Sequence, residues 1–392
     1  MSLIDVSNVN KNVIHLENSV ITTNTTKNIS SAFDYEFDGT RKTDIYIPNF
    51  PKSFQIGLIV GSSGSGKSTL LKLFGEEENI QWDNKYCIAD NFDSYGDAIG
   101  KLGAVGLNSI PSWLQSYNTL SNGEKFRADV ARRLKDNAVI DEFTSVVNRE
   151  CAISCSSCVQ KYIRNNDLQN IVFCSCHFDI IDYLQPDWVY NTDSKALSVG
   201  RSERQRQKII LEINQCFKQV WDMFKKHHYL SADLNKSADC YCVSWNSCLV
   251  AFGAILPMPG KFGNDTRKCV SEHRIVVLPD YQGIGIGNRF SEYLGELYLS
   301  QGYRYFGKTA NPRMGEHRNK SDRWKSTSTN MRKTKSLTDS QIDSMIRSVG
   351  RNTSAKSVIN SYSRLCYSHE YIGDSNRLFD DVVLKNKRSR LF

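Results

Sequence analysis

The sequence Gly61-Ser62-Ser63-Gly64-Ser65-Gly66-Lys67-Ser68-Thr69 directly follows the apolar run Ile56-Gly57-Leu58-Ile59-Val60. This order predicts a buried strand, a glycine-rich turn and the start of a helix. The amides of such a turn and the positive end of the helix dipole bind phosphate oxygens. Lys67 is placed to reach the β- and γ-phosphates, and Ser68 to ligate Mg²⁺. The alternative is a flexible Gly/Ser linker, but a linker does not account for the strand before the turn. We therefore expect a site for ATP.

Length and composition favour a folded protein of two domains. The 392 residues are enough for two separate cores. The sequence has no apolar run of about 18 residues, and residues 1–5 lack the character of a signal peptide. These features predict a cytoplasmic protein, of a bacterium or of a phage-infected host cell. The twelve cysteines are then expected to be thiols rather than disulfides.

Charge is distributed unevenly along the chain. Residues 201–392 carry 32 Lys and Arg against 18 Asp and Glu, whereas residues 1–200 carry 18 against 24. Within residues 304–335 there are ten Lys and Arg against two acidic residues. Such a density indicates an anionic partner, either nucleic acid or a phosphorylated molecule. A solvated loop of mixed use is the alternative.

Three further motifs follow the phosphate loop in a fixed order. Leu120-Ser121-Asn122-Gly123-Glu124 opens a predicted helix, Asn137-Ala138-Val139-Ile140 leads as a strand into Asp141-Glu142, and the strand 171–176 ends at His177. With the phosphate loop, these motifs resemble the ABC-type ATPases over residues 40–192. The resemblance implies that Ser121 and Gly123 contact the γ-phosphate and that Asp141 holds Mg²⁺ through water. It also implies that Glu142 activates the attacking water and that His177 senses the γ-phosphate.

The resemblance departs from transporter ATPases in one region. The stretch between the phosphate loop and Ser121 is short, and no glutamine in it is placed with certainty as the one that couples to membrane partners. Transport is therefore the weaker interpretation. The resemblance implies a head-to-tail homodimer in which Ser121 and Gly123 of one subunit close over the ATP at Lys67 of the other.

Cys151, Cys155 and Cys158 have a spacing similar to that of radical SAM enzymes, which hold an iron–sulfur cluster. However, residues 148–164 also have the pattern of a helix, in which these cysteines would be small buried residues. We favour the buried interpretation and leave metal binding open. Cys174 and Cys176 are likewise expected in the core.

The second half contains another phosphate-binding pattern. The strand His273–Leu278 and the turn Pro279-Asp280-Tyr281 precede Gln282-Gly283-Ile284-Gly285-Ile286-Gly287, which opens a helix. This resembles motif A of the GNAT acyltransferases, in which the turn and helix N-terminus hold the pyrophosphate of acetyl-CoA. A dinucleotide turn for NAD is the alternative, but it needs G-x-G-x-x-G and an acidic residue after the next strand.

The GNAT resemblance covers residues 209–373 and implies an arrangement of strands. A helix is predicted over residues 209–224, strands over 240–245 and 249–256, and a last strand near 365–373. In the family, strands corresponding to 274–278 and 303–309 diverge and the thioester lies between them. Val276 and Leu278 would then offer backbone groups to the pantetheine. Candidates for the base are Glu272 and His228, with its neighbours His227 and Tyr229, and Tyr367 is the candidate acid.

The whole chain resembles a small family of ABC ATPases fused to acetyltransferase domains, found in prokaryotes and their phages. We expect an α/β protein with an ABC-type ATPase domain (1–192), a linker (193–208), a GNAT-fold domain (209–373) and a basic tail (374–392).

Three functions remain open. The first is ATP-dependent acylation of nucleic acid, as in DNA modification, using the basic segment 304–335 with Trp324 and Tyr305 for stacking. The second is acylation of a protein or small amine regulated by an ABC clamp, and the third is a clamp whose GNAT fold only binds CoA. The sequence does not define the acyl group, the acceptor or the coupling between ATP and transfer.

Overall fold

The computed structural model describes residues 13–200, 209–228, 234–245, 247–258, 265–332, 340, 343 and 365–373. The chain forms two compact units, each drawn from separate stretches of sequence. The first consists of Met1–Gln81, Asp129–Asn148 and Val159–Gln205, and the second of Trp82–Ala128, Arg149–Cys158 and Arg206–Phe392. This division differs from the predicted boundary at residue 192, since residues 82–128 and 149–158 group with the C-terminal half. The predicted tail, 374–392, lies outside the described residues.

The first unit is built on a five-stranded sheet. Its strands are β3 (Ile56–Val60), β4 (Val139–Ile140), β5 (Ile171–Ser175), β6 (Trp188–Asn191) and β7 (Ala196–Val199). They lie in the order β4-β5-β3-β6-β7, with the first four parallel and β7 antiparallel to β6. β3 and β5 are buried along their whole length, as strands covered on both faces must be. Because β7 lies within residues 193–208, the first part of the predicted linker belongs to the sheet.

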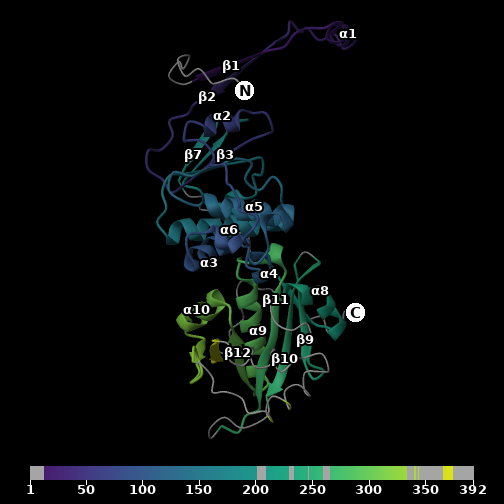
Figure 1. The fold of residues 1–392 in the computed structure, drawn as a ribbon, viewed down its shortest axis with the longest axis vertical. Helices are drawn as coiled ribbons and strands as arrows, with labels where there is room; N and C mark the ends of the chain where they lie inside the picture. The colour runs from purple at the N-terminus through teal and green to yellow at the C-terminus, as the bar shows by residue number, and fades with distance from the viewer. Residues whose placement is uncertain are drawn as a thin grey trace. The chain divides into compact units, whose positions relative to one another are not determined.

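Short helices and a hairpin complete the first unit. α2 (Lys67–Leu71) follows β3, and α7 (Ile181–Leu184) follows β5. β1 (Val13–Ser19) and β2 (Thr40–Tyr46) pair as an antiparallel ribbon, and α1 (Asn24–Ala32) lies at its far end (Figure 1). Ile45 of this ribbon joins the core cluster beneath β3 and α2.

The second unit begins with a helical segment. It contains η2 (Ile88–Asn91), α3 (Tyr95–Ala104), α4 (Ile110–Trp113) and η3 (Tyr117–Thr119). The division between the units falls inside α5 (Asn122–Arg133) and α6 (Arg149–Asn165), so each of these helices serves both. Cys151, Cys155 and Cys158 are buried on α6, which confirms the helical interpretation of this segment.

A seven-stranded sheet forms the rest of the second unit, in the order β13-β14-β12-β11-β10-β9-β8. The strands are β8 (Glu212–Gln215), β9 (Asp239–Trp245), β10 (Cys248–Met258), β11 (Cys269–Val277), β12 (Arg304–Thr309), β13 (Trp324–Ser326) and β14 (Tyr367–Tyr371). The helices are η4 (Lys218–Val220), α8 (Trp221–Phe224), η5 (Lys225–His227), η6 (Pro279–Tyr281), α9 (Ile286–Ser300) and α10 (Pro312–Lys320). α9 packs against β10, β11 and β12 through Phe290 and Leu294 (Figure 1). The predicted strands β9, β10, β11, β12 and β14 are confirmed.

One predicted element is wrong. Residues 209–224 do not form a helix, because β8 and two short helical turns occupy this stretch. Ile213 pairs with Val243 of β9 and joins the core beneath α9, whereas Trp221 and Phe224 join a different cluster around Phe252. The apolar spacing resembles a helix because two consecutive short elements each bury their own residues. Among the described residues, none of the helices has the length and apolar character that spanning a bilayer requires.

Candidate functional sites

The phosphate loop follows β3 as predicted, and its glycines are required by its shape. Gly61 and Gly66 have φ angles of 154° and 93°, which disfavour residues with a side chain. A Cβ atom on Gly61 would lie 1.9 Å from Thr192 Oγ1, and one on Gly66 would lie 2.6 Å from Ile45 Cδ1. Ser62, Ser63 and Gly64 are exposed along the turn, and Ser68 is exposed in the first turn of α2. Thr69 also lies in α2, and its amide donates to Gly66 O at 3.1 Å.

Lys67 is held over this loop. Its side chain is buried, and its Nζ donates to Gly61 O at 3.0 Å and to Ser62 O at 2.8 Å. Both acceptors belong to the turn itself, so the ammonium group already lies over the backbone that would surround a phosphate.

Asp193 is part of this site and was not predicted. Its carboxylate accepts from Ser62 N at 2.9 Å and from Ser62 Oγ at 2.7 Å, and its neighbour Thr192 bonds Ser65 Oγ at 2.6 Å. Both residues follow β6, which lies beside β3 in the sheet. The only sequence signal is the polar triplet Asn191-Thr192-Asp193 after an apolar run, which is too common to identify a site.

Asp141, Glu142 and His177 lie at the same edge of the sheet as the loop, because β4, β5 and β3 are parallel and their carboxyl ends meet at one edge. Thr144 Oγ1 and His177 Nδ1 are 3.1 Å apart, and His177 N donates to Ser175 Oγ at 3.0 Å. Glu142 has a φ of 48°, so the chain turns sharply at this carboxylate.

The residues predicted to ligate Mg²⁺ fit a hard cation. Cys174 Sγ donates to Lys67 O, one residue before Ser68. Burial, and then the charge of Asp141, raise the pKa of the Cys174 thiol. A carboxylate and a hydroxyl are the oxygen ligands that Mg²⁺ prefers.

Ser121 caps α5, and Gly123 lies in the first turn of that helix. Ser121 N and Oγ donate to Glu124 Oε2 at 3.0 and 2.7 Å, while Glu124 N donates to Ser121 Oγ at 3.4 Å. This reciprocal pair is a capping box, which explains why the helix starts here. Ser121 is exposed. Glu124 Oε1 also accepts a hydrogen bond from Ser112 Oγ, at 2.7 Å.

In the second unit, a glycine-rich turn follows β11 and leads into α9. Gly283 and Gly285 have φ angles of 87° and 95°, and Gly285 is the N-cap of α9. Gly287 lies in the first turn of α9, where a Cβ atom would be 3.4 Å from Val277. The first amides of this 15-residue helix therefore follow a turn in which Gly283 and Gly285 carry no side chain.

Beside this turn, two parallel strands separate. β11 and β12 pair only at Cys269–Arg304, Val270–Tyr305 and Ser271–Phe306, so the last residues of β11 have no partner on β12. A cavity of about 260 Å³ lies next to these residues. It is lined by the end of β11, the glycine turn, the start of α10 and the end of η5: Ile275, Val276, Val277, Tyr281, Gln282, Gly283, Gly285, Gly287, Asn288, Asn311, Arg313, Met314, His227 and His228, with Asn108. The predicted Leu278, Glu272 and Tyr367 do not line it.

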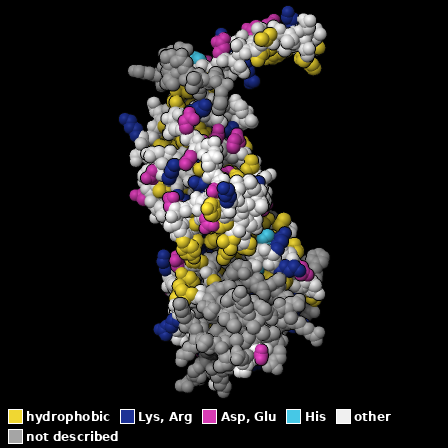
Figure 2. Space-filling model, viewed as in Figure 1, with side chains coloured by type: hydrophobic (Ala, Val, Ile, Leu, Met, Phe, Trp, Pro, Cys, Tyr) yellow, Lys and Arg dark blue, Asp and Glu magenta, His cyan; other side chains and the backbone are white. Residues whose placement is uncertain are grey.

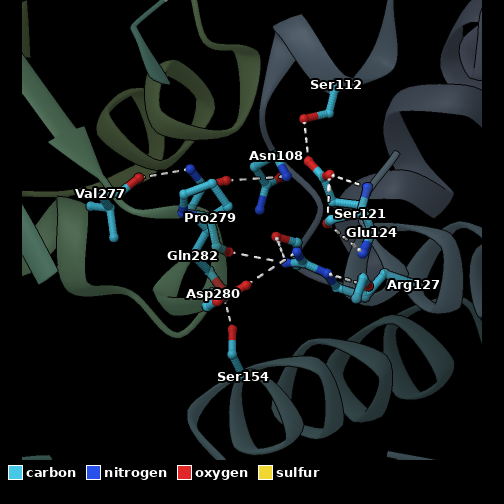
Figure 3. Close-up of polar contacts among 12 residues, drawn as sticks. Asn108, Ser112, Ser121, Glu124, Arg127, Ser154, Val277, Pro279, Asp280 and Gln282 are labelled. Atoms are coloured by element: carbon cyan, nitrogen blue, oxygen red, sulfur yellow. Dashed lines mark hydrogen bonds and ion pairs between the residues drawn. The ribbon is translucent and has the colours of Figure 1, made fainter. Parts of the chain in front are cut away.

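Contacts from Asn108, from Arg127 of α5 and from Ser154 of α6 hold the turn (Figure 3). Gln282 Nε2 donates to Val277 O at 2.8 Å, Asn108 N donates to Gln282 Oε1 at 3.1 Å, and Ser154 Oγ donates to Gln282 O. Arg127 Nη1 donates to Pro279 O at 3.0 Å and its Nη2 pairs with Asp280 at 3.3 Å. Asn108, Arg127 and Ser154 were not predicted to contact this turn, since nothing in their sequence context marks them for it.

The candidate bases have different surroundings. His227 and His228 both line the cavity, and the ring of His228 packs edge-on against Trp221. Burial, and then the charge of Lys226, lower the pKa of His227, so this imidazole is neutral at pH 7. Tyr229 lies outside the described residues.

Glu272 lies in a buried polar cluster. Its carboxylate receives Arg318 Nη2 at 2.9 and 2.8 Å, Tyr305 OH at 3.1 Å and the Ser291 hydroxyl. Tyr367 packs over Gly315 of α10, where an added Cβ would lie 2.0 Å from the ring, and burial raises the pKa of its phenol.

The basic segment differs from the prediction in its aromatic residues. Tyr305 and Trp324 are 0% and 5% exposed, so neither ring is available to stack on bases. Arg318 lies over the Trp324 ring at 4.1 Å, and Arg304 pairs with Glu370 at 2.6 Å. Among the described residues of the segment, exposed cations remain at Lys308, Arg313, Lys320, Lys325 and Arg332. Where described side chains are drawn, Figure 2 shows Lys and Arg intermixed with Asp and Glu.

The cysteines of α6 do not gather metal ligands. Within the part of the chain that the structure describes, no group of three or more His, Cys, Asp or Glu side chains could hold a metal ion. Burial raises the pKa of Cys151 to about 11 and that of Cys155 well above its usual value, so both are protonated core thiols.

Comparisons with known proteins bear on the two halves separately. Residues 207–317 match the model of the acetyltransferase (GNAT) family. Similar solved structures include the dimeric structure of MJ0796, a bacterial ABC transporter cassette, at 15% identity and a TM-score of 0.31, over 38% of this chain and 87% of that one. Another is a dimeric post-hydrolysis state of the same cassette bound to ADP and Pi, at 15% identity and a TM-score of 0.31. This match covers 40% of this chain and 88% of that one. No curated protein matches the chain. Residues 207–317 therefore form a domain of the GNAT acetyltransferase family, carried by a chain whose first half is a P-loop α/β region with ABC-type motifs.

Proposed function

We propose that the chain is an ATP-hydrolysing ABC-type ATPase coupled to an acyl-CoA-dependent N-acyltransferase. The observation that carries this proposal is the cavity beside the end of β11 that has no partner on β12, under the glycine turn that opens α9. Its wall combines backbone groups for an extended thiol arm, helix amides for a pyrophosphate and two histidines. The cavity belongs to the part of the chain that matches the GNAT family.

Acyl-CoA binding uses the turn and β11. The amides of Gly283, Gly285 and Gly287 receive the pyrophosphate, and Gln282 fixes the turn by bonding Val277 O. The edge of β11 that has no partner on β12, at Val276 with Leu278 beyond it, receives the pantetheine. NAD is less well supported, because β11 lies between an antiparallel β10 and a parallel β12 with which it pairs briefly.

Acyl transfer requires a neutral amine that attacks the thioester carbonyl carbon, after which the C–S bond breaks. We assign His228, assisted by His227, as the base that takes the amine proton, since both line the cavity. The departing CoA thiolate takes this proton from the His228 imidazolium, because Tyr367, the predicted donor, does not line the cavity. Glu272 is less well placed than the histidines, because Arg318, Tyr305 and Ser291 engage its carboxylate.

The first unit is assigned ATP binding and hydrolysis. Lys67 and the loop amides hold the phosphates, Ser68 and Asp141 hold Mg²⁺, and Glu142 orients water with His177 beside it. Mg²⁺ supplies charge neutralisation at the phosphates when bound. Ser121 and Gly123 complete the site of a second copy in a homodimer.

The acceptor is proposed to be an amine, with nucleic acid as the class that the basic segment indicates. Nucleic acid is supported by the exposed Lys308, Arg313, Lys320, Lys325 and Arg332 alone, since Tyr305 and Trp324 are buried. That burial favours the second candidate, an amine of a protein or small molecule.

The test is transfer of labelled acetyl groups by the purified full chain, with ATP and separate acceptors: DNA, RNA, a polyamine and a lysine peptide. Activity with one acceptor, lost in Gly285→Glu and His228→Ala, supports the proposal, and mass spectrometry of the product identifies the acylated atom. Failure to bind acetyl-CoA in a calorimetric titration overturns the acyltransferase assignment. Failure of Lys67→Ala to lower ATP hydrolysis overturns the ATPase assignment.

A further inference from the structure

Residues 279–283, which we call the CoA loop, have two different sides. Tyr281, Gln282 and Gly283 line the cavity. The other side contacts α5, α6 and residues 106–108, which lie more than a hundred positions earlier in the sequence (Figure 3). Movement of these earlier elements therefore moves the cavity wall.

Arg127 is the strongest of these contacts. Its side chain is 2% exposed, and its guanidinium donates to Pro279 O at 3.0 Å and pairs with Asp280 at 3.3 Å. Its Nε donates to Gly123 O at 3.2 Å, in the first turn of α5. One rigid, planar group thus joins the proposed γ-phosphate-binding turn to the CoA loop.

The CoA loop packs closely against α6 and Gly106. A Cβ atom on Gly283 would lie 2.1 Å from Cys158 Sγ of α6 and 3.4 Å from Gly106 Cα. Asn108 N and Ser154 Oγ bond the side chain and the carbonyl of Gln282. Since close-packed elements shift together rather than compress, a displacement of α5 or α6 reaches the loop.

Glu124 provides the link to the nucleotide. It accepts from Ser121 N, Ser121 Oγ and Ser112 Oγ. Burial alone would raise the pKa of Glu124. The hydrogen bonds from Ser112 and Ser121 and the charge of Arg127 outweigh it, so the pKa is lowered and the carboxylate is ionised. A phosphate that took the amide and hydroxyl of Ser121 would remove two of these bonds, one helical turn from Arg127.

We propose that α5 couples the two ligands: nucleotide bound at Ser121 and Gly123 changes the acyl-CoA affinity of the cavity through Arg127 and the CoA loop. The inference rests on the proposed function and adds the route of its regulation. Because coupling between binding sites is reciprocal, acyl-CoA changes nucleotide affinity by the same factor.

The experiment titrates acetyl-CoA calorimetrically into the full chain, with and without a saturating non-hydrolysable ATP analogue and Mg²⁺. We expect the two dissociation constants to differ by about fivefold or more, the range of typical allosteric coupling. In Asp280→Asn and Arg127→Lys, the ratio of the acetyl-CoA dissociation constants without and with the ATP analogue should approach one. Each ligand alone should still bind. Asp265→Asn is the matched control, because it also removes one charge from an arginine pair of this unit, at 2.7 Å from Arg267.

The outcomes separate the two ideas. If the unaltered chain binds neither ligand, the proposed function fails and the coupling with it. If both ligands bind with affinities independent of each other, only the coupling is overturned. If coupling exists but persists in Asp280→Asn, the route through Arg127 is wrong. Should Arg127→Lys fold poorly in a thermal melt, Asp280→Asn decides alone, since that side chain is 43% exposed and tolerates an isosteric change.

Discussion

Gly283 shows how one position combines backbone strain with close packing. It has a φ of 87°, and an added Cβ would meet Cys158 at 2.1 Å, whereas Gly302 has a φ of 80° with open space around it. We expect Gly302→Ala to cost about 1 kcal/mol in unfolding free energy, from the backbone conformation alone. Gly283→Ala should cost about 2 kcal/mol more and weaken acetyl-CoA binding.

Urea unfolding measures both variants. Adding Cys158→Ala to Gly283→Ala should recover the steric part of the loss and leave the backbone part. Equal losses at Gly283 and Gly302 would contradict the packing of α6 against the CoA loop.

His273 is predicted to make the fold sensitive to mild acid. It lies at a bulge between β10 and β11, and Asn235 N donates to its Nε2 at 3.2 Å. Burial, and then the charge of Arg274, lower the pKa of His273 to about 3. Between pH 7 and pH 5 the unfolded chain takes up a proton that the folded chain does not, so the unfolding free energy falls by about 1–2 kcal/mol from this residue.

His273→Gln removes that contribution. Urea unfolding at pH 7 and at pH 5 should show a smaller loss of stability in the variant than in the unaltered chain. The pKa of the buried His369 is lowered to about 4 by burial and by the charge of Arg318. His369 therefore contributes to the loss of stability at pH 5 in both the variant and the unaltered chain. An unchanged difference between the two pH values would show that His273 is protonated in the fold.

At the scale of elements, Glu272 joins β11 to β12, α9 and α10 through Tyr305, Ser291 and Arg318. Arg318 and Glu272 are 1% and 5% exposed. Glu272→Gln leaves a buried guanidinium without its counter-charge, which should cost about 3–5 kcal/mol of unfolding free energy.

Thermal unfolding and acyl transfer should therefore fall together in Glu272→Gln. The double variant Glu272→Gln/Arg318→Met should regain stability, because it removes the unmatched charge. Loss of transfer at full stability would instead restore Glu272 as the catalytic base.

Elements whose pattern is local were predictable from the sequence. The continuous apolar run of β3, the glycine turns at 61–66 and 282–287, and the strands β9–β12 and β14 all appear where expected. β8 was not predictable from the sequence. Ile209, Ile213 and Phe217 have helical spacing, whereas the strand is defined by its pairing with β9. Trp324 and Tyr305 were misjudged because their burial depends on tertiary neighbours such as Tyr371.

The candidate sites divide in the same way. Residues that we propose to contact a ligand through a motif, such as Lys67 and Gly285, follow from local sequence. Asp193, Asn108 and Arg127 act on motifs that lie 131, 174 and 152 positions away. No window along the chain brings such pairs together, so only the fold reveals them.

At the scale of the whole molecule, ATP is expected to control the oligomeric state. In Glu142→Gln the proposed homodimer should bind ATP without hydrolysing it, since the water-positioning carboxylate is gone. Light scattering after size exclusion should then report twice the mass of the chain with Mg-ATP and the single mass without it. Lys67→Ala/Glu142→Gln is the control, and it should stay monomeric at every ATP concentration.

A dimer of Glu142→Gln that forms equally well without nucleotide would contradict the ATP-dependent association. Ser121→Arg provides a second check, because a bulky side chain at this exposed cap should prevent closure. Its α5 helix should remain folded, since the cap is at the surface.

The location of the supports for the CoA loop has a practical consequence for dissecting the protein. Gly106, Asn108, Arg127, Ser154 and Cys158 all precede residue 207, where the family match begins. A fragment cloned from that position would keep every recognisable motif of the acyltransferase and lose the scaffold behind its cofactor turn. We expect such a truncation to purify with impaired acetyl-CoA binding, so failure of the isolated half would be a consequence of where it was cut.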